Sequence, residues 1–278
     1  MCIKGVQDMN NIGFIGLGNM GASILKAVAN SDKNLKIGIF DTDIEKANIL
    51  KSELSDFNEN ITIEKNLSDL VDNSSVVMLC VKPQILAKLY AEIQFACYND
   101  PLFISIAAGI KTSTLAKELE SKRIVRFMPN LAAKCNKSVT AICASSSTGD
   151  ADVQTAMQIA EKFGSAFVLD EDKFSAFIGI SGSAIAFVFE FAHSIALGGT
   201  HEGIAYDVAL DIAFQTMDSA KSLFEVDKEN PISLMSKVCS AGGTTIEGIK
   251  TLSDYNFSSA VINSVVNTSK KSKELEKK

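Results

Sequence analysis

Apolar positions in the first 170 residues form short runs separated by amphipathic stretches. The runs predict strands at 12–16, 36–40, 61–63, 76–81, 102–106, 124–127, 139–144 and 166–169. The stretches between them have helical periodicity and predict helices at 20–29, 43–54, 84–95, 112–120 and 150–163. Strands that alternate with helices in this way are typical of a mostly parallel sheet with right-handed crossovers.

The pattern changes after about residue 170. Strand-like runs stop, and helical patterns cover 174–197, 204–224, 244–252 and 258–275. We therefore expect an α/β domain at 1–170 and an all-α domain at 171–278. The helical part carries several apolar faces, which predicts a homodimer or a larger homo-oligomer built through these helices.

The most apolar window, at 182–199, is interrupted by Glu190 and His193. A membrane span needs about 20 largely uninterrupted apolar residues, so this window predicts a helix buried in a core or a subunit interface. Residues 1–11 are polar and lack the apolar stretch of a signal peptide, while Met1 and Met9 both remain candidate starts. We expect a soluble, cytoplasmic protein.

Composition and charge argue against nucleic acid and membranes as partners of this chain. The chain has 278 residues, is 46% hydrophobic and carries a net charge of −6. An acidic chain has no general attraction for nucleic acid or for an anionic membrane. Its six cysteines are scattered without a CxxC pair. This spacing favours reduced thiols and predicts neither a disulfide framework nor a metal site.

The first chemical motif is a GxGxxG sequence that follows the first predicted strand. Gly16 would allow the tight turn, Gly18 would let the backbone approach a pyrophosphate, and Gly21 would let the helix pack closely on the strand. The helix N-terminus would then face the anion. The motif predicts a dinucleotide site.

Asp41 ends the second predicted strand, twenty residues beyond Gly21. An acidic side chain there can accept hydrogen bonds from the adenosine ribose and would repel a 2′-phosphate. No arginine lies between Asp41 and Lys46. NADH is therefore the first choice of cofactor and NADPH the second. The alternative interpretation is that Asp41 or Asp43 caps the following helix.

Six segments carry recognisable motifs in a fixed order, at 15–20, 76–84, 105–110, 125–130, 181–183 and 239–246. The most specific reads Gly-Gly-Thr-Thr-Ile at 242–246. In these segments the chain resembles the pyrroline-5-carboxylate reductases, which reduce a cyclic imine to proline. The resemblance extends over nearly the whole chain and implies a Rossmann-like domain followed by a helical dimerisation domain.

The resemblance also implies site residues. With the glycine motif, the expected cofactor contacts are Ile15, Gly16, Gly18, Asn19, Met20, Gly21, Asp41, Cys80, Val81, Lys82, Pro83, Ala107, Ala108 and Gly109. The implied substrate contacts are Gly242, Gly243, Thr244, Thr245 and Glu171, of which Glu171 is the weaker candidate. Thr245 is the implied catalytic residue, through a hydrogen bond to the ring nitrogen of the imine.

The glycine-threonine segment also suits a carboxylate on physical grounds. Thr244 and Glu247 match a capping box, with Thr244 as N-cap and Glu247 at N3. A glycine pair before a helix start exposes backbone N–H groups at the positive end of the helix dipole. An ordinary glycine turn with a cap is the alternative interpretation.

The two histidines, His193 and His201, lie in no catalytic motif. This fits imine reduction, because a protonated imine accepts hydride without a strong protein acid. A β-hydroxyacid dehydrogenase would need a lysine on the first interdomain helix, and residues 179–193 contain none.

Departures from the family pattern lie at 131–132, 175–178, 184–185 and 241. They leave open a reductase of another cyclic imine and a non-catalytic nucleotide-binding protein.

Overall fold

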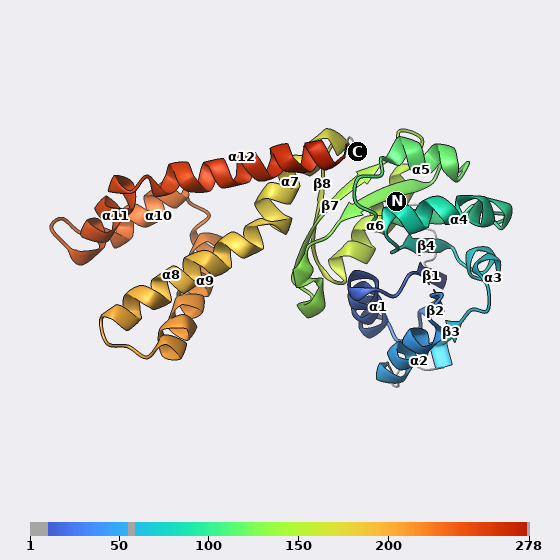
Figure 1. The fold of residues 1–278 in the computed structure, drawn as a ribbon, viewed down its shortest axis with the longest axis horizontal. Helices are drawn as coiled ribbons and strands as arrows, with labels where there is room; N and C mark the ends of the chain where they lie inside the picture. The colour runs from blue at the N-terminus through green and yellow to red at the C-terminus, as the bar shows by residue number, and fades with distance from the viewer. Residues whose placement is uncertain (1–10, 55–58, 277–278) are drawn as a thin grey trace, which may run out of the picture. The chain divides into compact units, whose positions relative to one another are not determined.

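The computed structural model describes residues 11–54 and 59–276 (Figure 1). The two candidate starts, Met1 and Met9, lie outside the described residues. The chain divides into two compact units. The first comprises residues 1–177 and 272–278, and the second comprises residues 178–271. The domain boundary expected at 170 stays a prediction, and the first compact unit extends beyond it.

An eight-stranded sheet in the order β3-β2-β1-β4-β5-β6-β7-β8 forms the centre of the first unit. All neighbouring strands are parallel except β6 and β7, which are antiparallel. The strands are β1 (Asn11–Ile15), β2 (Lys36–Phe40), β3 (Ile61–Ile63), β4 (Val76–Leu79), β5 (Leu102–Ser105), β6 (Ile124–Met128), β7 (Ser138–Ala144) and β8 (Gly164–Val168). The mostly parallel sheet predicted from the sequence is confirmed, with each strand within a few residues of its expected range.

Helices cover both faces of this sheet. They are α1 (Asn19–Ser31), α2 (Ile44–Glu53), α3 (Leu67–Asp72), α4 (Pro83–Phe95), α5 (Thr112–Glu118), α6 (Asp150–Glu161) and α7 (Phe174–Phe177), with the 3-10 turns η2 (Leu131–Cys135) and η3 (Glu171–Lys173). One core joins the sheet to α1, α2 and α6, and the other joins it to α3, α4 and α5. In β1, Phe14 faces the first core and Ile15 the second, as strand alternation requires.

The second unit is entirely helical. It contains the π-helical turn η4 (Ile178–Gly182), α8 (Ala184–His201), α9 (Tyr206–Asp227), α10 (Pro231–Val238), α11 (Thr244–Asp254) and α12 (Phe257–Leu275), whose last turn returns to the first unit. The helical pattern predicted at 174–197 is interrupted, because Ser183 N–H bonds to the Ile178 carbonyl across a π turn.

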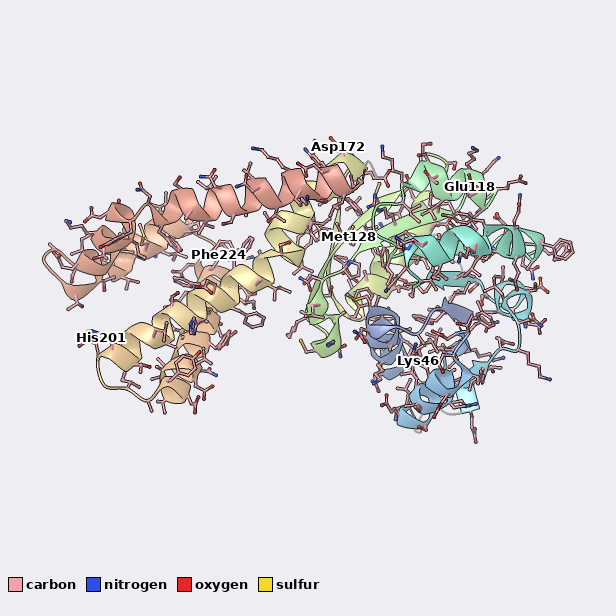
Figure 2. The ribbon with its side chains drawn as sticks, in the orientation of Figure 1. Lys46, Glu118, Met128, Asp172, His201 and Phe224 are labelled. Carbon is pink, nitrogen blue, oxygen red and sulfur yellow. The ribbon has the colours of Figure 1, made fainter. Side chains whose placement is uncertain are left out.

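The second unit buries few large side chains within one chain. Between α8 and α9 the buried residues are alanines, Ala192, Ala196, Ala209 and Ala213. Large apolar side chains remain exposed, including Phe189 at 57% and Phe224, labelled in Figure 2, at 50%. The stretch Glu171–His201 is long and apolar enough to cross a membrane by length and composition, and 28% of its most apolar window is buried. Most of this window is therefore exposed within one chain, and burial in a subunit interface stays the prediction.

Candidate functional site

The loops that follow four adjacent parallel strands meet at one edge of the sheet. β1, β2, β4 and β5 all point their carboxyl ends to this edge. The strand order reverses between β1 and β4, and ligands of open α/β sheets bind in the crevice at such a point. The structure therefore brings the predicted cofactor residues of all four loops to one side of the first unit.

Close contacts favour glycine at two positions of the motif, Gly16 in the β1–α1 loop and Gly21 in the first turn of α1. Gly16 has a positive φ of 94°, and a Cβ there would lie 2.6 Å from Cγ1 of Val81. A Cβ on Gly21 would collide with the carbonyl oxygen of Gly16. These contacts give Gly16 the role of tight turn and Gly21 the role of close helix–strand packing, as the motif predicts.

Gly18 differs from both, because a Cβ added to it would meet no atom within 4 Å. Gly18 is exposed and is the N-cap of α1, without a side-chain hydrogen bond to the first turn. The first turn also has no acidic residue. The first N–H groups of a helix have no carbonyl of that helix to bind, so this helix start, with the open space beside Gly18, suits an anion.

The side chain of Asp41 binds the glycine loop. Its Oδ2 accepts a hydrogen bond from the backbone N–H of Leu17 at 2.7 Å, and its Oδ1 accepts one from Asp43 N–H at 3.0 Å. The cap of α2 is Asp43, which accepts from Lys46 N–H at 3.1 Å. The capping alternative is therefore correct for Asp43 and wrong for Asp41.

The loops after β4 and β5 complete this edge. Lys82 is the N-cap of α4 and Pro83 is its first residue, where the missing N–H of proline costs no hydrogen bond. Burial raises the pKa of the Cys80 thiol to about 12, so this cysteine is neutral near pH 7. After β5, Ala107 is buried, while Ala108 and Gly109 are exposed.

The predicted substrate segment lies in the second unit, at the start of α11. The N-cap of this helix is Gly243, without a side-chain hydrogen bond. The capping box expected from Thr244 and Glu247 is therefore wrong, since Thr244 is already the first helical residue. A Cβ on Gly243 would collide with the Ser240 hydroxyl, so the Ser240 side chain packs closely against this turn.

This correction leaves the start of α11 open to a ligand. Among the residues that the structure describes, the hydroxyls of Thr244 and Thr245 have no hydrogen-bond partner, and Thr245 is half-buried. Uncapped N–H groups beside two hydroxyls suit a small carboxylate.

Glu171 is engaged within the first unit. Its Oε1 accepts a hydrogen bond from Thr112 N–H at 2.8 Å and lies 3.0 Å from Nη1 of Arg126. Its Oε2 accepts from the Thr112 hydroxyl at 3.1 Å. The substrate contact expected for Glu171 stays a prediction, and these bonds point to another role.

The sequence interpretation did not include Arg126, Thr112 or Leu17. The sequence could have indicated Arg126 as a candidate, because an arginine inside the apolar run 124–127 must either be exposed to solvent or form an ion pair. Leu17 donates only its backbone N–H, and Thr112 donates its backbone N–H as well as its hydroxyl; a backbone donor carries no signal in the sequence.

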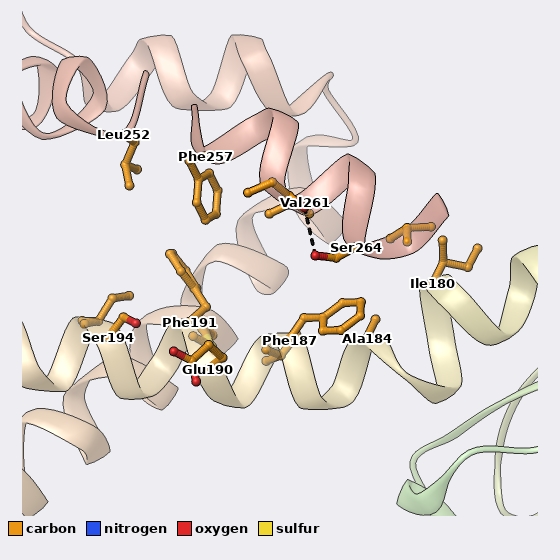
Figure 3. A pocket seen from close by; sticks show the side chains of 15 residues that line it. Ile180, Ala184, Phe187, Glu190, Phe191, Ser194, Leu252, Phe257, Val261 and Ser264 are labelled. Atoms are coloured by element: carbon orange, nitrogen blue, oxygen red, sulfur yellow. Dashed lines mark hydrogen bonds between the residues drawn. The ribbon is translucent and has the colours of Figure 1, made fainter. Parts of the chain in front are cut away.

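The second unit also contains an apolar pocket of about 930 Å³. Figure 3 shows Phe187 and Phe191 of α8 opposite Phe257 and Val261 of α12. The rings of Phe191 and Phe257 lie 5.7 Å apart between centroids. Glu190 is the only charged residue among those that line the pocket. An apolar surface of this size on one chain is typical of a protein–protein or ligand-binding site.

Comparison with known proteins decides the family. Residues 171–275 match the family model described as pyrroline-5-carboxylate reductase dimerisation, and residues 11–109 match the model described as NADP oxidoreductase, coenzyme F420-dependent. The pyrroline-5-carboxylate reductase of Aquifex aeolicus is 34% identical over 95% of this chain and 97% of its own. The chain belongs to the pyrroline-5-carboxylate reductase family. The Escherichia coli enzyme is 33% identical over 96% of this chain and 98% of its own.

Solved structures of the family have the same fold. The pyrroline-5-carboxylate reductase of Coxiella burnetii superimposes with a TM-score of 0.88 at 25% identity, covering 96% of this chain and 99% of its own. The Streptococcus pyogenes enzyme superimposes with a TM-score of 0.79 at 27% identity, covering 95% of this chain and 98% of its own. The family is NAD(P)-dependent, and its dimerisation domain explains why α8–α12 expose so much apolar surface.

Proposed function

We propose that this protein reduces pyrroline-5-carboxylate to L-proline with a nicotinamide dinucleotide. The observation that carries the proposal is the pair of uncapped, glycine-bounded helix starts, Gly18 before α1 and Gly243 before α11. Each offers free backbone N–H groups to an anion, one to a pyrophosphate and one to a carboxylate. Relatives that carry the name pyrroline-5-carboxylate reductase support this choice of substrate.

The proposed cofactor contacts are the residues at the carboxyl edge of the first unit. Gly16, Gly18 and Gly21 shape the pyrophosphate site, and Asp41 accepts from the adenosine ribose. The remaining proposed contacts are Ile15, Asn19, Met20, Cys80, Val81, Lys82, Pro83, Ala107, Ala108 and Gly109. NADH is the proposed reductant, because the carboxylate of Asp41 would repel the 2′-phosphate of NADPH.

The proposed substrate contacts are Gly242, Gly243, Thr244 and Thr245. The loop amides hold the substrate carboxylate, and the Thr245 hydroxyl bonds to the ring nitrogen. The bound nicotinamide would supply the hydride that reduces the C=N bond at C5, giving the amine of proline. The pyrroline nitrogen is protonated from solution. The histidines are engaged elsewhere, since His193 Nδ1 lies 2.9 Å from the Tyr206 hydroxyl and His201 Nδ1 lies 3.0 Å from Glu202 Oε1.

Glu171 stays the weaker candidate for a substrate contact, since both of its carboxylate oxygens already accept hydrogen bonds in the first unit. We propose that a second copy of the chain covers the apolar pocket of α8 and α12, giving a homodimer or a larger homo-oligomer. Proline synthesis would take place in the cytoplasm.

A reductase of another cyclic imine is the second candidate. Ala184 and Ile185, at the start of α8, and Ala241, beside the substrate loop, differ from the family pattern near the substrate. Alanine at 241 leaves the loop freer than proline would. The third candidate is a binder of NAD(P) without catalysis.

The test is NADH and NADPH oxidation by the purified protein with pyrroline-5-carboxylate. Turnover supports the proposal, and the better cofactor decides the preference. Turnover only with another cyclic imine supports the second candidate. NADH binding without turnover of any imine supports the third.

A further inference from the structure

Arg126 of β6 is a buried cation with few partners. Its side chain is 2% exposed, and its guanidinium carbon lies 4.8 Å from the centre of the Phe174 ring. Nη1 donates to Glu171 Oε1 at 3.0 Å, while Nη2 lies 3.7 Å from Glu276 Oε1. Among the described residues, Nε and Nη2 have no hydrogen-bond partner. The buried charge of Arg126 therefore depends chiefly on the carboxylate of Glu171.

The same carboxylate holds the start of α5. Thr112 is the first residue of this helix, and its N-cap Lys111 makes no side-chain hydrogen bond. Glu171 instead accepts from both the N–H and the hydroxyl of Thr112, from 59 residues away in the chain. A carboxylate at this position acts as the cap that the local sequence lacks.

Thr112 is also the far end of the loop that follows β5. The near end is fixed to the sheet, because Ile106 N–H bonds to the Leu79 carbonyl at 3.1 Å and Ala107 N–H bonds to the Ser105 hydroxyl at 3.2 Å. Between these ends lies Gly109, with φ at 76°. The far end is held through Thr112, so the path of residues 107–109 depends on Glu171.

We propose that Glu171 and Arg126 are a positioning pair for the nicotinamide dinucleotide. Arg126 orients Glu171, and Glu171 fixes Thr112 and with it the cofactor loop at 107–109. The inference rests on the proposed function and gives Glu171 a role on the cofactor side. Neither residue touches the reacting atoms.

The test measures NADH affinity without any imine, by fluorescence titration of the full-length protein. Glu171→Gln removes the charge opposite Arg126, and Thr112→Val removes one bond to Glu171 at nearly constant volume. We expect each variant to raise the Kd for NADH about fivefold, the effect of one or two lost charge-assisted hydrogen bonds. Thr112→Ser keeps the hydroxyl and should restore the wild-type Kd.

Asp152→Asn is the matched control. It breaks the ion pair between Nη2 of Arg123, the residue before β6, and Oδ1 of Asp152 on α6, which are 2.7 Å apart. It should lower the Tm without changing the Kd for NADH. Should Glu171→Gln fail to fold, Thr112→Val and Thr112→Ser still carry the test.

Three results separate the possibilities. An unchanged Kd in folded Glu171→Gln and Thr112→Val, with only the Tm lowered, overturns the inference in favour of a purely structural role. An unchanged Kd with a raised KM for the imine overturns it in favour of a substrate contact. Wild-type protein that binds neither NADH nor NADPH overturns the proposed function itself, and the inference with it.

Discussion

The carboxylate of Asp41 accepts a hydrogen bond from the backbone N–H of Leu17, with 2.7 Å between oxygen and nitrogen. Leu17 lies between Gly16 and Gly18, so the end of β2 holds the loop that follows β1. The other Asp41 oxygen accepts from Asp43 N–H. Asp41 therefore supports the glycine loop directly, in the position where the ribose of a dinucleotide is expected.

Asp41→Ser should weaken NADH binding about tenfold and improve the ratio of NADPH to NADH turnover, because it removes the ribose acceptor and its charge. Steady-state kinetics with both cofactors measure the ratio. Asp43→Ser is the control, since Asp43 caps α2 and should affect the Tm alone. An unchanged cofactor ratio in Asp41→Ser would remove Asp41 from the proposed ribose site.

Gly18→Ala should leave the Tm unchanged, because the added Cβ meets no atom within 4 Å. It should weaken NADH binding about tenfold or more, since the methyl group occupies the space proposed for the pyrophosphate. Gly21→Ala should instead lower the Tm, because its Cβ collides with the Gly16 carbonyl. Calorimetry and NADH titration of both variants separate the two effects, and full NADH affinity in Gly18→Ala would contradict the site.

Thr245→Ala should reduce kcat/KM for pyrroline-5-carboxylate about tenfold, the cost of one lost hydrogen bond in the transition state. The Kd for NADH should not change. Thr244→Ala provides a comparison at the preceding position and should raise KM more than it lowers kcat. Wild-type kinetics in Thr245→Ala would exclude the role proposed for its hydroxyl.

Phe187→Asp should convert the assembly to monomers, because it places a charge in the apolar pocket that a second copy is proposed to cover. Light scattering after size exclusion gives the mass. Phe95→Asp is the control, since Phe95 is 76% exposed on α4 of the first unit. A mass that does not change in Phe187→Asp would place the interface elsewhere.

Glu64→Gln should slightly raise the Tm at pH 7. Partial burial and the nearby charge of Asp69 raise the pKa of the Glu64 carboxyl, so its ionised form destabilises the fold. The destabilisation is fully present when the pH is above the pKa of Glu64 in the folded protein. It disappears when the pH falls below the pKa of Glu64 in the unfolded chain. Thermal melts of both proteins should therefore differ at pH 7 and coincide near pH 4; equal Tm values at pH 7 would contradict the assignment.

Much of the first unit could be predicted, because its strands are buried on both faces and stand out as apolar runs. β2 and β3 have the predicted bounds, and the motif roles of Gly16 and Gly21 match contacts in the structure. The short helix α3 was missed, although Asn66 is its N-cap and accepts from Asp69 N–H. Six residues are too few for a helical period to be recognised.

The second unit was harder to predict, because long-range contacts set its details. Gly179 lies in the π turn where a Cβ would be 2.9 Å from the Val265 carbonyl of α12, and nothing near residue 179 indicates that approach. α10 was missed although Asn230 and Pro231 form a standard helix start. The N-cap of α11 was predicted at Thr244 but is Gly243, since the turn of Gly243 against Ser240 comes directly before the threonines.

The most direct test of the central claim follows the hydride. The purified protein is incubated with pyrroline-5-carboxylate and NADH deuterated at C4 of the nicotinamide, and the product is analysed by mass spectrometry and NMR. The proposal predicts L-proline carrying deuterium at C5. Absence of labelled proline, with NADH bound and the imine intact, would contradict the claim that this protein is a working pyrroline-5-carboxylate reductase.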